Sequence, residues 1–315
     1  MWTHELNIRN RGGEPKVAEL AKNPTNLTAV IVEEKLTPPW KEACLSFYKN
    51  RLAVIGLGIV VFFIIIAVIA PVIAPYSYKE QVLTDRMLPP SSDHWFGTDD
   101  FGRDIFSRIV YGARISLWVG FFSVLGSVVA GTFLGIVAGY YGRWVDAIIS
   151  RIFDIMLAFP SILLAIAVVS ILGPSLQNAL IAIAVINIPN FGRLVRSKVL
   201  SVKQEEYIMA ARAVGMRDTR ILLRHILPNS ISPVIVQATL AIATAIIEAA
   251  ALGFLGMGAQ APTPEWGKML ADSKNYITQA PWTLFFPGVA IMLTVLGFNL
   301  MGDGLRDILD PKMKQ

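Results

Sequence analysis

The sequence of 315 residues is unusually apolar: 54% of its residues are hydrophobic, only 16% are charged, and the mean hydropathy is +0.54. A soluble globular domain carries about 25% charged residues, so this composition excludes an ordinary soluble domain and favours a membrane protein. The net charge of +5 follows the loops between apolar runs, which does not indicate a nucleic-acid-binding surface. The single cysteine, Cys44, excludes an internal disulfide framework and a cysteine-based metal site.

The N-terminal region is polar and of mixed charge, without sustained helical periodicity until near Trp40. We predict that residues 1–39 form a cytoplasmic tail, because such a composition cannot bury enough apolar surface to fold. The region is not a signal peptide, since the first apolar run begins only at Leu52 and is longer than a signal-peptide core.

The apolar runs that follow are free of Asp, Glu, Lys and Arg over lengths that suit membrane helices, which need about 20 residues. The longest run, 155–192, has 38 residues, and Gly173-Pro174 marks a turn near its middle. We therefore predict an all-α integral membrane protein with six transmembrane helices. The predicted spans are 52–75, 115–140, 150–172, 176–194, 233–256 and 284–303.

The distribution of basic residues predicts the orientation of these spans. Six crossings place both termini on one side, and that side carries 21 of the 28 Lys and Arg residues, against 7 on the other. Because cytoplasmic loops of membrane proteins are enriched in Lys and Arg, we expect both termini and the loop 193–224 to be cytoplasmic.

This cytoplasmic loop contains a segment with the pattern of a folded unit. Tyr207, Ala210, Ala211 and Val214 share one narrow helix face, and Gly215 stands where a helix commonly ends in the left-handed conformation. A second helix follows, for which Asp218 is the candidate N-cap and which Pro228 is expected to stop at Leu227. On it, Arg217, Arg220 and Arg224 form a predicted basic stripe.

Two hypotheses account equally well for a helix–Gly–helix unit with this pattern. It is an interfacial amphipathic segment whose arginines bind lipid phosphates, or it is a docking surface for a cytoplasmic protein. Periodicity does not separate the two.

The segment resembles the EAA loop of permease subunits in bacterial ATP-binding-cassette importers. Ala210-Ala211, Gly215 and Leu227-Pro228 fall at that family's spacing, whereas Met209 replaces its Glu and His225 replaces its Ile. These departures resemble the peptide and nickel branch of the family. The resemblance implies that the loop fits a groove in an ATPase subunit and carries nucleotide-driven motion to the membrane helices. The expected coupling-loop residues are Tyr207, Ala210, Ala211, Val214, Gly215, Arg217, Arg220, Arg224, Leu227 and Pro228.

A second stretch, "HWFGTDDFGRDIFSRIVYGARISL" at 94–117, is similar to the second permease subunit of oligopeptide and dipeptide importers. Similar segments extend from about Trp40 to Lys312. The resemblance implies a first transmembrane helix and extracytoplasmic segment over 40–114, and a permease core over 115–315 with its coupling loop at about 195–232. It also implies location in the bacterial inner membrane.

The same resemblance implies the partners and the activity. The chain is expected to form half of a peptide pathway together with a second permease subunit, two ATPase subunits and an extracytoplasmic peptide-binding protein. ATP and Mg²⁺ are expected on the ATPases, because this sequence lacks the G-x-x-x-x-G-K-[ST] phosphate-binding loop. We predict no catalytic residues, no metal site and no cofactor in this chain. Alternatives are import of nickel, an opine or glutathione within the family and, from other classes, a secondary transporter, a channel or a membrane enzyme.

Two intramembrane features carry further hypotheses. Gly131, Gly135 and Gly139 form a row that lets a neighbouring helix approach closely, in this chain or in a partner permease. Glu248 is costly inside a bilayer, so it either pairs with another polar group or lines a hydrated translocation path. Asn178, Asn187, Asn190 and Asn299 are candidates for hydrogen bonds between helices.

Overall fold

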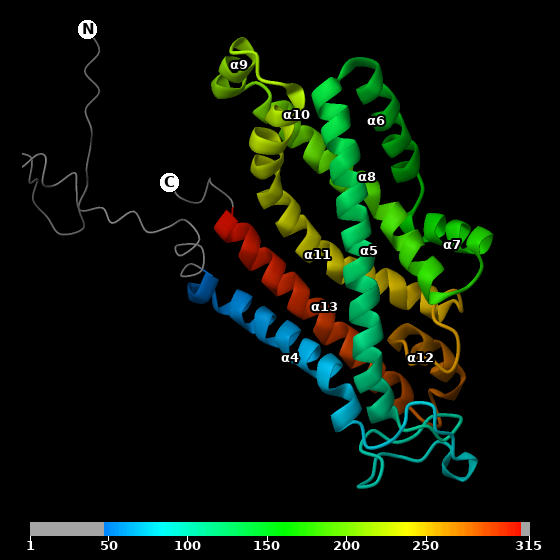
Figure 1. Ribbon diagram of the computed structural model, residues 1–315. Coiled ribbons are helices and arrows are strands. Elements are labelled where there is room, and N and C mark those ends of the chain that lie inside the picture. Colours follow the sequence, from blue (N-terminus) through cyan, green and yellow to red (C-terminus); the bar gives the residue numbers. More distant parts are fainter. Residues whose placement is uncertain (1–46, 310–315) are drawn as a thin grey trace, which may run out of the picture. The chain divides into compact units, whose positions relative to one another are not determined.

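The computed structural model describes residues 47–309, which lie in one helical unit (Figure 1). The predicted tail at 1–39 and both chain ends fall outside these residues. The part of the chain that is described contains no β-strand, only an isolated bridge between Thr98 and Asp104. The helices are α4 (Arg51–Ile73), α5 (Ile105–Tyr141), α6 (Arg143–Ala158), α7 (Ser161–Leu172), α8 (Leu176–Val202), α9 (Glu206–Ala213), α10 (Asp218–Ile221), α11 (Leu227–Phe254), α12 (Trp266–Ser273) and α13 (Trp282–Leu309).

The helices agree with the predicted all-α membrane architecture. Five helical segments are long and apolar enough to cross a bilayer: α4, α5, α8, the stretch Asp218–Phe254 that includes α11, and α13. A sixth crossing is formed only if α6 and α7 are counted together, and these two helices are bent by 98°.

The continuous helix predicted over 150–172 is therefore wrong. The chain breaks at Phe159-Pro160, where Phe159 takes an extended backbone conformation before the proline. A proline disfavours helical geometry in the residue before it and lacks a backbone N–H. The predicted turn at Gly173 is confirmed, since Gly173 ends α7 with a φ of 92° and the side chain of Ser175 caps α8.

Helices α5 and α8 form the most extensive helix pair of the structure. Gly131, Gly135 and Gly139 face α8, and a methyl group added at Gly135 would lie 2.5 Å from the carbonyl oxygen of Gly192. The glycine row therefore packs against a helix of the same chain, as one of the two hypotheses stated. Because α8 approaches this closely, its buried side chains Val195 and Val199 pack directly against the surface of α5.

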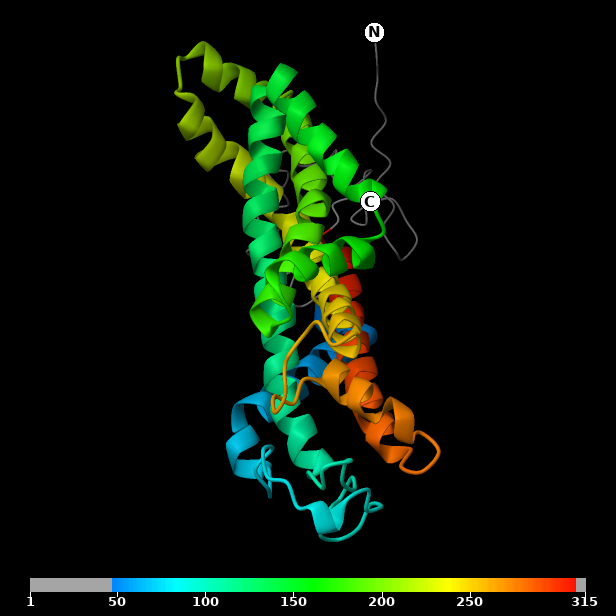
Figure 2. The same ribbon diagram turned by 90° about the vertical axis from the view of Figure 1, so that its right-hand side faces the viewer.

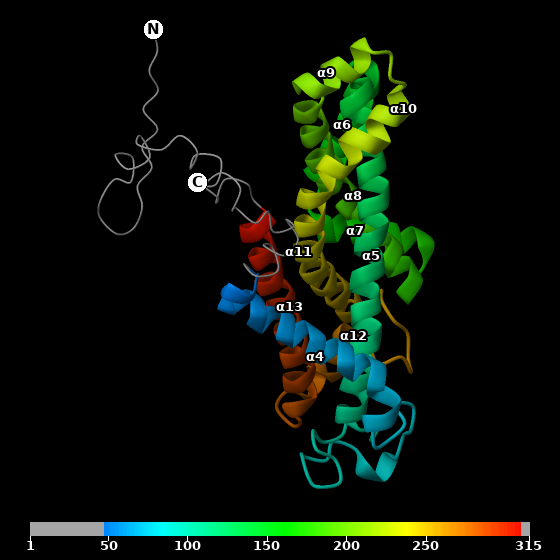
Figure 3. The same cartoon turned by 60° about the vertical axis from the view of Figure 1, so that its left-hand side comes forward.

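Helix α4 lies beside α13, and α13 in turn contacts α11 (Figures 1 and 3). Gly56 of α4 and Gly297 of α13 permit this contact, since a methyl group added at Gly56 would lie 2.6 Å from the backbone nitrogen of Met301. Small residues at membrane helix contacts allow the backbones to approach, which increases van der Waals packing.

The segments between α4 and α5 and between α11 and α13 lie at the end of the bundle opposite α9 and α10 (Figure 2). Helix α5 begins at Ile105, ahead of the predicted residue 115, because Asp104 caps it by accepting a hydrogen bond from the Ser107 backbone at 2.7 Å. Trp266 of α12 is fully buried against this first part of α5 and donates to the carbonyl of Ile109 at 3.1 Å.

Charged residues in the segment between α4 and α5 and in the first turn of α5 are paired with one another. Asp99 accepts a hydrogen bond from Arg103 Nε at 2.6 Å and lies 3.6 Å from Arg108 Nε, and both arginines are at most 2% exposed. His94 Nδ1 lies 3.0 Å from Asp104. These charges therefore hold the segment between α4 and α5 onto the first turns of α5.

Candidate functional site

The residues expected to form the coupling loop fold into the predicted helix–Gly–helix unit, which is called the coupling unit after that expectation and comprises α9, Gly215 and α10. Gly215 follows α9 with a φ of 81°, which confirms the left-handed residue expected there. Its backbone N–H donates to the carbonyl of Arg212 at 2.9 Å, and that of Met216 donates to Ala211 at 3.0 Å. These two bonds form a Schellman motif, which satisfies the terminal carbonyls of α9 and turns the chain sharply toward α10.

The unit is anchored through isoleucines rather than through the apolar face that the spacing identified. Ile208, Ile221 and Ile226 are fully buried. Tyr207 and Ala210 are exposed, and Val214 is 88% exposed. The face predicted from periodicity is therefore largely exposed, although Ala211 is partly buried and the Tyr207 hydroxyl accepts a hydrogen bond from Asn229 at 3.1 Å.

Two sequence-based predictions about the second helix are wrong. Asp218 does not cap α10 but is its first residue, and its carboxylate accepts a hydrogen bond from the Tyr140 hydroxyl at the end of α5. Pro228 does not stop the helix, because the chain continues through a π-helical turn, η2 (Leu222–Ile226), into α11.

The π turn explains how the proline is tolerated. The backbone N–H of Leu227 donates to the carbonyl of Leu222, five residues earlier, so the helix is widened just before Pro228. A proline ring would otherwise clash with the carbonyl four residues before it. The coupling unit is thus joined to the membrane helix α11 without a flexible link, since 218–254 is helical throughout.

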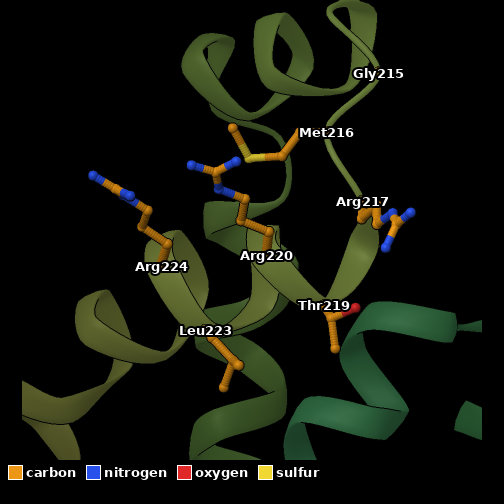
Figure 4. A pocket seen from close by; sticks show the side chains of 7 residues that line it. All are labelled: Gly215, Met216, Arg217, Thr219, Arg220, Leu223 and Arg224. Carbon is orange, nitrogen blue, oxygen red and sulfur yellow. The ribbon is translucent and has the colours of Figure 1, made fainter.

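The surface around Gly215 is a basic groove with a volume of about 890 Å³. Figure 4 shows the side chains of Arg220 and Arg224 extending to one side and that of Arg217 to the other. Arg217 precedes the helix in an extended conformation, so the predicted three-residue stripe contains only two helical members. The groove is lined by Gly215, Met216, Arg217, Thr219, Arg220, Leu223 and Arg224.

Glu248 lies inside the bundle and is only 8% exposed. Asn187 of α8 donates a hydrogen bond to its carboxyl oxygen at 3.0 Å, and Asn190 donates to Asn187 at 3.4 Å. The pairing of Glu248 with a polar group and the role of Asn187 between helices are therefore confirmed. Because Asn190 is exposed, this chain of polar groups runs from α11 through α8 to the surface.

At the end of the bundle opposite α9 and α10, Glu265 is buried and accepts hydrogen bonds from the backbones of Gly267 and Lys268, both at 2.8 Å, as the N-cap of α12. Burial raises the pKa of Glu265 to about 7. Over residues 47–309, no three His, Cys, Asp or Glu side chains are arranged to hold a metal ion.

The chain matches known proteins over most of its length. Residues 131–315 match the family described as the inner membrane component of binding-protein-dependent transport systems, and residues 38–90 match the N-terminal transmembrane domain of oligopeptide transport permease C. The first match covers the glycine row at the end of α5, all of α6 to α13 and the segment around Gly215.

Curated relatives and one solved structure agree with these matches. A dipeptide transport system permease protein DppC of Alkalihalophilus pseudofirmus is 68% identical, covering 88% of this chain and 91% of the relative. A glutathione transport system permease protein GsiD of Pectobacterium atrosepticum is 50% identical, covering 90% and 95%. An inward-facing structure of the MetNI methionine ABC transporter has a similar fold, with a TM-score of 0.53 at 22% identity over 64% of this chain and 96% of that one.

The predicted all-α membrane fold is thus confirmed. With a family match over more than half of its residues and a relative that is 68% identical, the chain belongs to the inner membrane components of binding-protein-dependent transport systems, as an ABC permease of the oligopeptide permease C type.

Proposed function

We propose that this chain forms half of the pathway of an ATP-driven importer of di- or oligopeptides. Its partners are a second permease subunit, two ATPase subunits that bind ATP and Mg²⁺, and an extracytoplasmic peptide-binding protein. The relatives support a peptide-like substrate, because dipeptides and glutathione both present amide bonds and terminal charges. Import of nickel or an opine has no comparable support among these relatives.

The observation that carries this proposal is the exposed elbow at Gly215. A Schellman motif at Gly215 sets the angle between α9 and α10, and buried isoleucines pack the unit against the rest of the chain. The surface around Gly215 is an open groove lined by arginines. Because this unit is joined to α11 by continuous helix, a movement of the unit in an ATPase groove would move α11 as well. The alternative is that the arginines of this unit bind lipid headgroups, and the experiment has to distinguish that role from ATPase docking.

The test is Gly215→Val, because a β-branched residue takes a positive φ only at a cost of about 1–2 kcal/mol or more. We expect the variant to lose peptide uptake and ATPase co-purification while the permease pair still inserts. Gly173→Val is the matched control, since Gly173 also has a positive φ and open space around it but lies at the α7–α8 turn. Arg220→Glu should act like Gly215→Val through charge reversal in the groove. Full uptake with normal ATPase recovery in Gly215→Val would defeat the proposed coupling.

The orientation follows from the same proposal. The Gly215 elbow is cytoplasmic, as are both termini, and the segments around Asp99 and Trp266 face outward, where they contribute to the seat of the binding protein. The charge asymmetry of 21 to 7 supports this orientation. It is also supported by the arrangement in Figure 2, where the outer segments and the coupling unit lie at opposite ends.

We further propose that Glu248 lies beside the translocation path. Its support is the hydrogen-bonded chain through Asn187 to the exposed Asn190, since an exposed amide in a membrane span is favourable only toward water or protein. Glu248→Gln should alter uptake while leaving insertion and assembly intact. A purely structural pair would instead lose detergent stability in step with activity, and normal uptake with normal stability would remove both roles.

A further inference from the structure

Tyr140, in the last turn of α5, is buried at 5% exposure although it lies at the end of a membrane helix beside the coupling unit. Figure 3 shows α9 and α10 at this same end of α5. Tyrosine at a membrane helix end is usually explained by the interfacial aromatic belt. Its neighbour Tyr141 fits that explanation, since it is 57% exposed, but Tyr140 does not.

Residues from three segments surround Tyr140: α9, α10 and the residue that follows α8. Its hydroxyl donates a hydrogen bond to Asp218, the first residue of α10. The guanidinium of Arg212, in the last turn of α9, lies 5.3 Å from the centre of its ring. Lys203, which follows α8, donates to the Tyr140 carbonyl at 2.6 Å, and its ammonium lies 5.5 Å from the ring centre.

These contacts attach both sides of the elbow to one side chain. Arg212 precedes Gly215 and Asp218 follows it, so a rotation of the elbow changes two contacts of Tyr140 together. Tyr140 belongs to α5, which packs along α8 through Gly131, Gly135 and Gly139. A displacement at Tyr140 is therefore passed to the α5–α8 pair, in addition to the direct continuation of the elbow into α11.

We propose that Tyr140 is a positioning residue that transmits movement of the coupling elbow to the α5–α8 pair. This inference rests on the proposed coupling function. It assigns a side-chain route into the membrane domain, in addition to the chain connections through α8 on one side and through η2 and α11 on the other. The hydroxyl contact with Asp218 is the part of that route that a single substitution can remove without changing the shape of the core.

Tyr140→Phe is the principal test, because it removes only the hydroxyl and leaves the ring facing Arg212 and Lys203. The complex is reconstituted in proteoliposomes, and uptake of radiolabelled alanyl-alanine is measured together with phosphate release. We expect uptake per ATP hydrolysed to fall about tenfold, the scale of a hydrogen bond to a charged group. ATPase co-purification and the melting temperature should remain those of the wild type. Tyr141→Phe, one residue away with an exposed side chain, is the matched control and should change nothing.

A double variant tests whether the hydroxyl acts through its partner. Asp218→Asn alone should also lower uptake per ATP, and Tyr140→Phe combined with Asp218→Asn should cost no more than the larger single effect. Unchanged uptake per ATP in Tyr140→Phe would overturn the inference, as would a loss of ATPase association in proportion to the loss of uptake. Failure of Gly215→Val to uncouple would instead overturn the proposed function, so the two failures are distinguishable.

Discussion

A methyl group added at Gly135 tests whether the close contact of α5 and α8 stabilises the permease. Such a methyl would lie 2.5 Å from the Gly192 carbonyl oxygen, 2.9 Å from Val195 Cβ and 3.1 Å from the Arg196 backbone nitrogen. Two of these three atoms belong to the backbone of α8, so the clash cannot be relieved by a side-chain rotation. The helices would have to separate by roughly 1 Å to restore ordinary van der Waals contact.

The magnitude follows from two opposing terms. Replacing a helical glycine by alanine gains about 1 kcal/mol of helix propensity, whereas overpacking a close contact costs about 1–3 kcal/mol, or more against backbone. Because the nearest atoms are backbone atoms, we take the upper part of that range, about 2–3 kcal/mol, and expect Gly135→Ala to destabilise the permease by about 1–2 kcal/mol. At roughly 2–4 °C per kcal/mol, this lowers the melting temperature by several degrees.

The assay is thermal unfolding of the purified complex in detergent, followed by intrinsic fluorescence. Gly58→Ala is the matched control, because Gly58 lies in α4 with no atom within 4 Å of the added methyl. That variant should keep or slightly raise the melting temperature. An unchanged melting temperature for Gly135→Ala, or an equal drop for Gly58→Ala, would refute the assignment of the glycine row to helix contact.

Two further predictions concern the end of the bundle opposite α9 and α10. Asp99→Asn should destabilise the segment between α4 and α5 by about 3 kcal/mol, the lower end of the range for a broken buried pair, because Arg108 loses its nearest carboxylate whereas Arg103 keeps Asp100 at 3.8 Å and Asp272 at 4.0 Å. Limited proteolysis should then cut between α4 and α5, whereas Lys268→Gln, in a half-buried pair, should change little. Burial raises the pKa of Glu265 to about 7, so the folded state favours the protonated carboxyl. Its contribution to the free energy of unfolding is therefore fully present below about pH 4.5, the ordinary pKa of a Glu, and is lost as the pH rises through 7. The melting temperature should therefore fall from pH 5 to 8 in the wild type and fall less in Glu265→Gln, and parallel curves would contradict this account.

The sequence was sufficient to predict those features that depend on local rules. Charge-free runs predict the membrane helices, a four-residue glycine spacing predicts a close helix contact, and Gly215 is predicted by the conformation that only glycine adopts readily. The structure bears out the fold, the glycine contact and the positive φ at Gly215. Each of these properties is set within a few residues along the chain.

The two prolines show why the same local rules give opposite results at different places. Pro160 breaks the predicted span at 150–172, whereas Pro228 is absorbed into a continuous helix. Pro71, Pro189, Pro233 and Pro287 also lie inside α-helices. Pro228 is preceded by a five-residue π turn, and the side chains of Ile221, just before this turn, and Ile226, at its end, are buried. Tertiary packing holds that widened turn, and no signal in the proline's own neighbourhood predicts it.

Asp218 illustrates the same limit for a polar group. An acidic residue after a glycine turn satisfies the pattern of an N-cap, yet its partner is Tyr140, 78 residues away. The bond becomes possible only because α5 and α8 are packed so closely that Tyr140, Lys203 and the elbow meet at one place. Under the proposed function, the glycine row and the tyrosine contact therefore act together: without close packing the movement of Tyr140 would be absorbed between the helices, and without the Tyr140 hydroxyl the packed pair would lose its hydrogen bond to α10. Combining Gly135→Ala with Tyr140→Phe should consequently reduce uptake per ATP by less than the product of their separate effects.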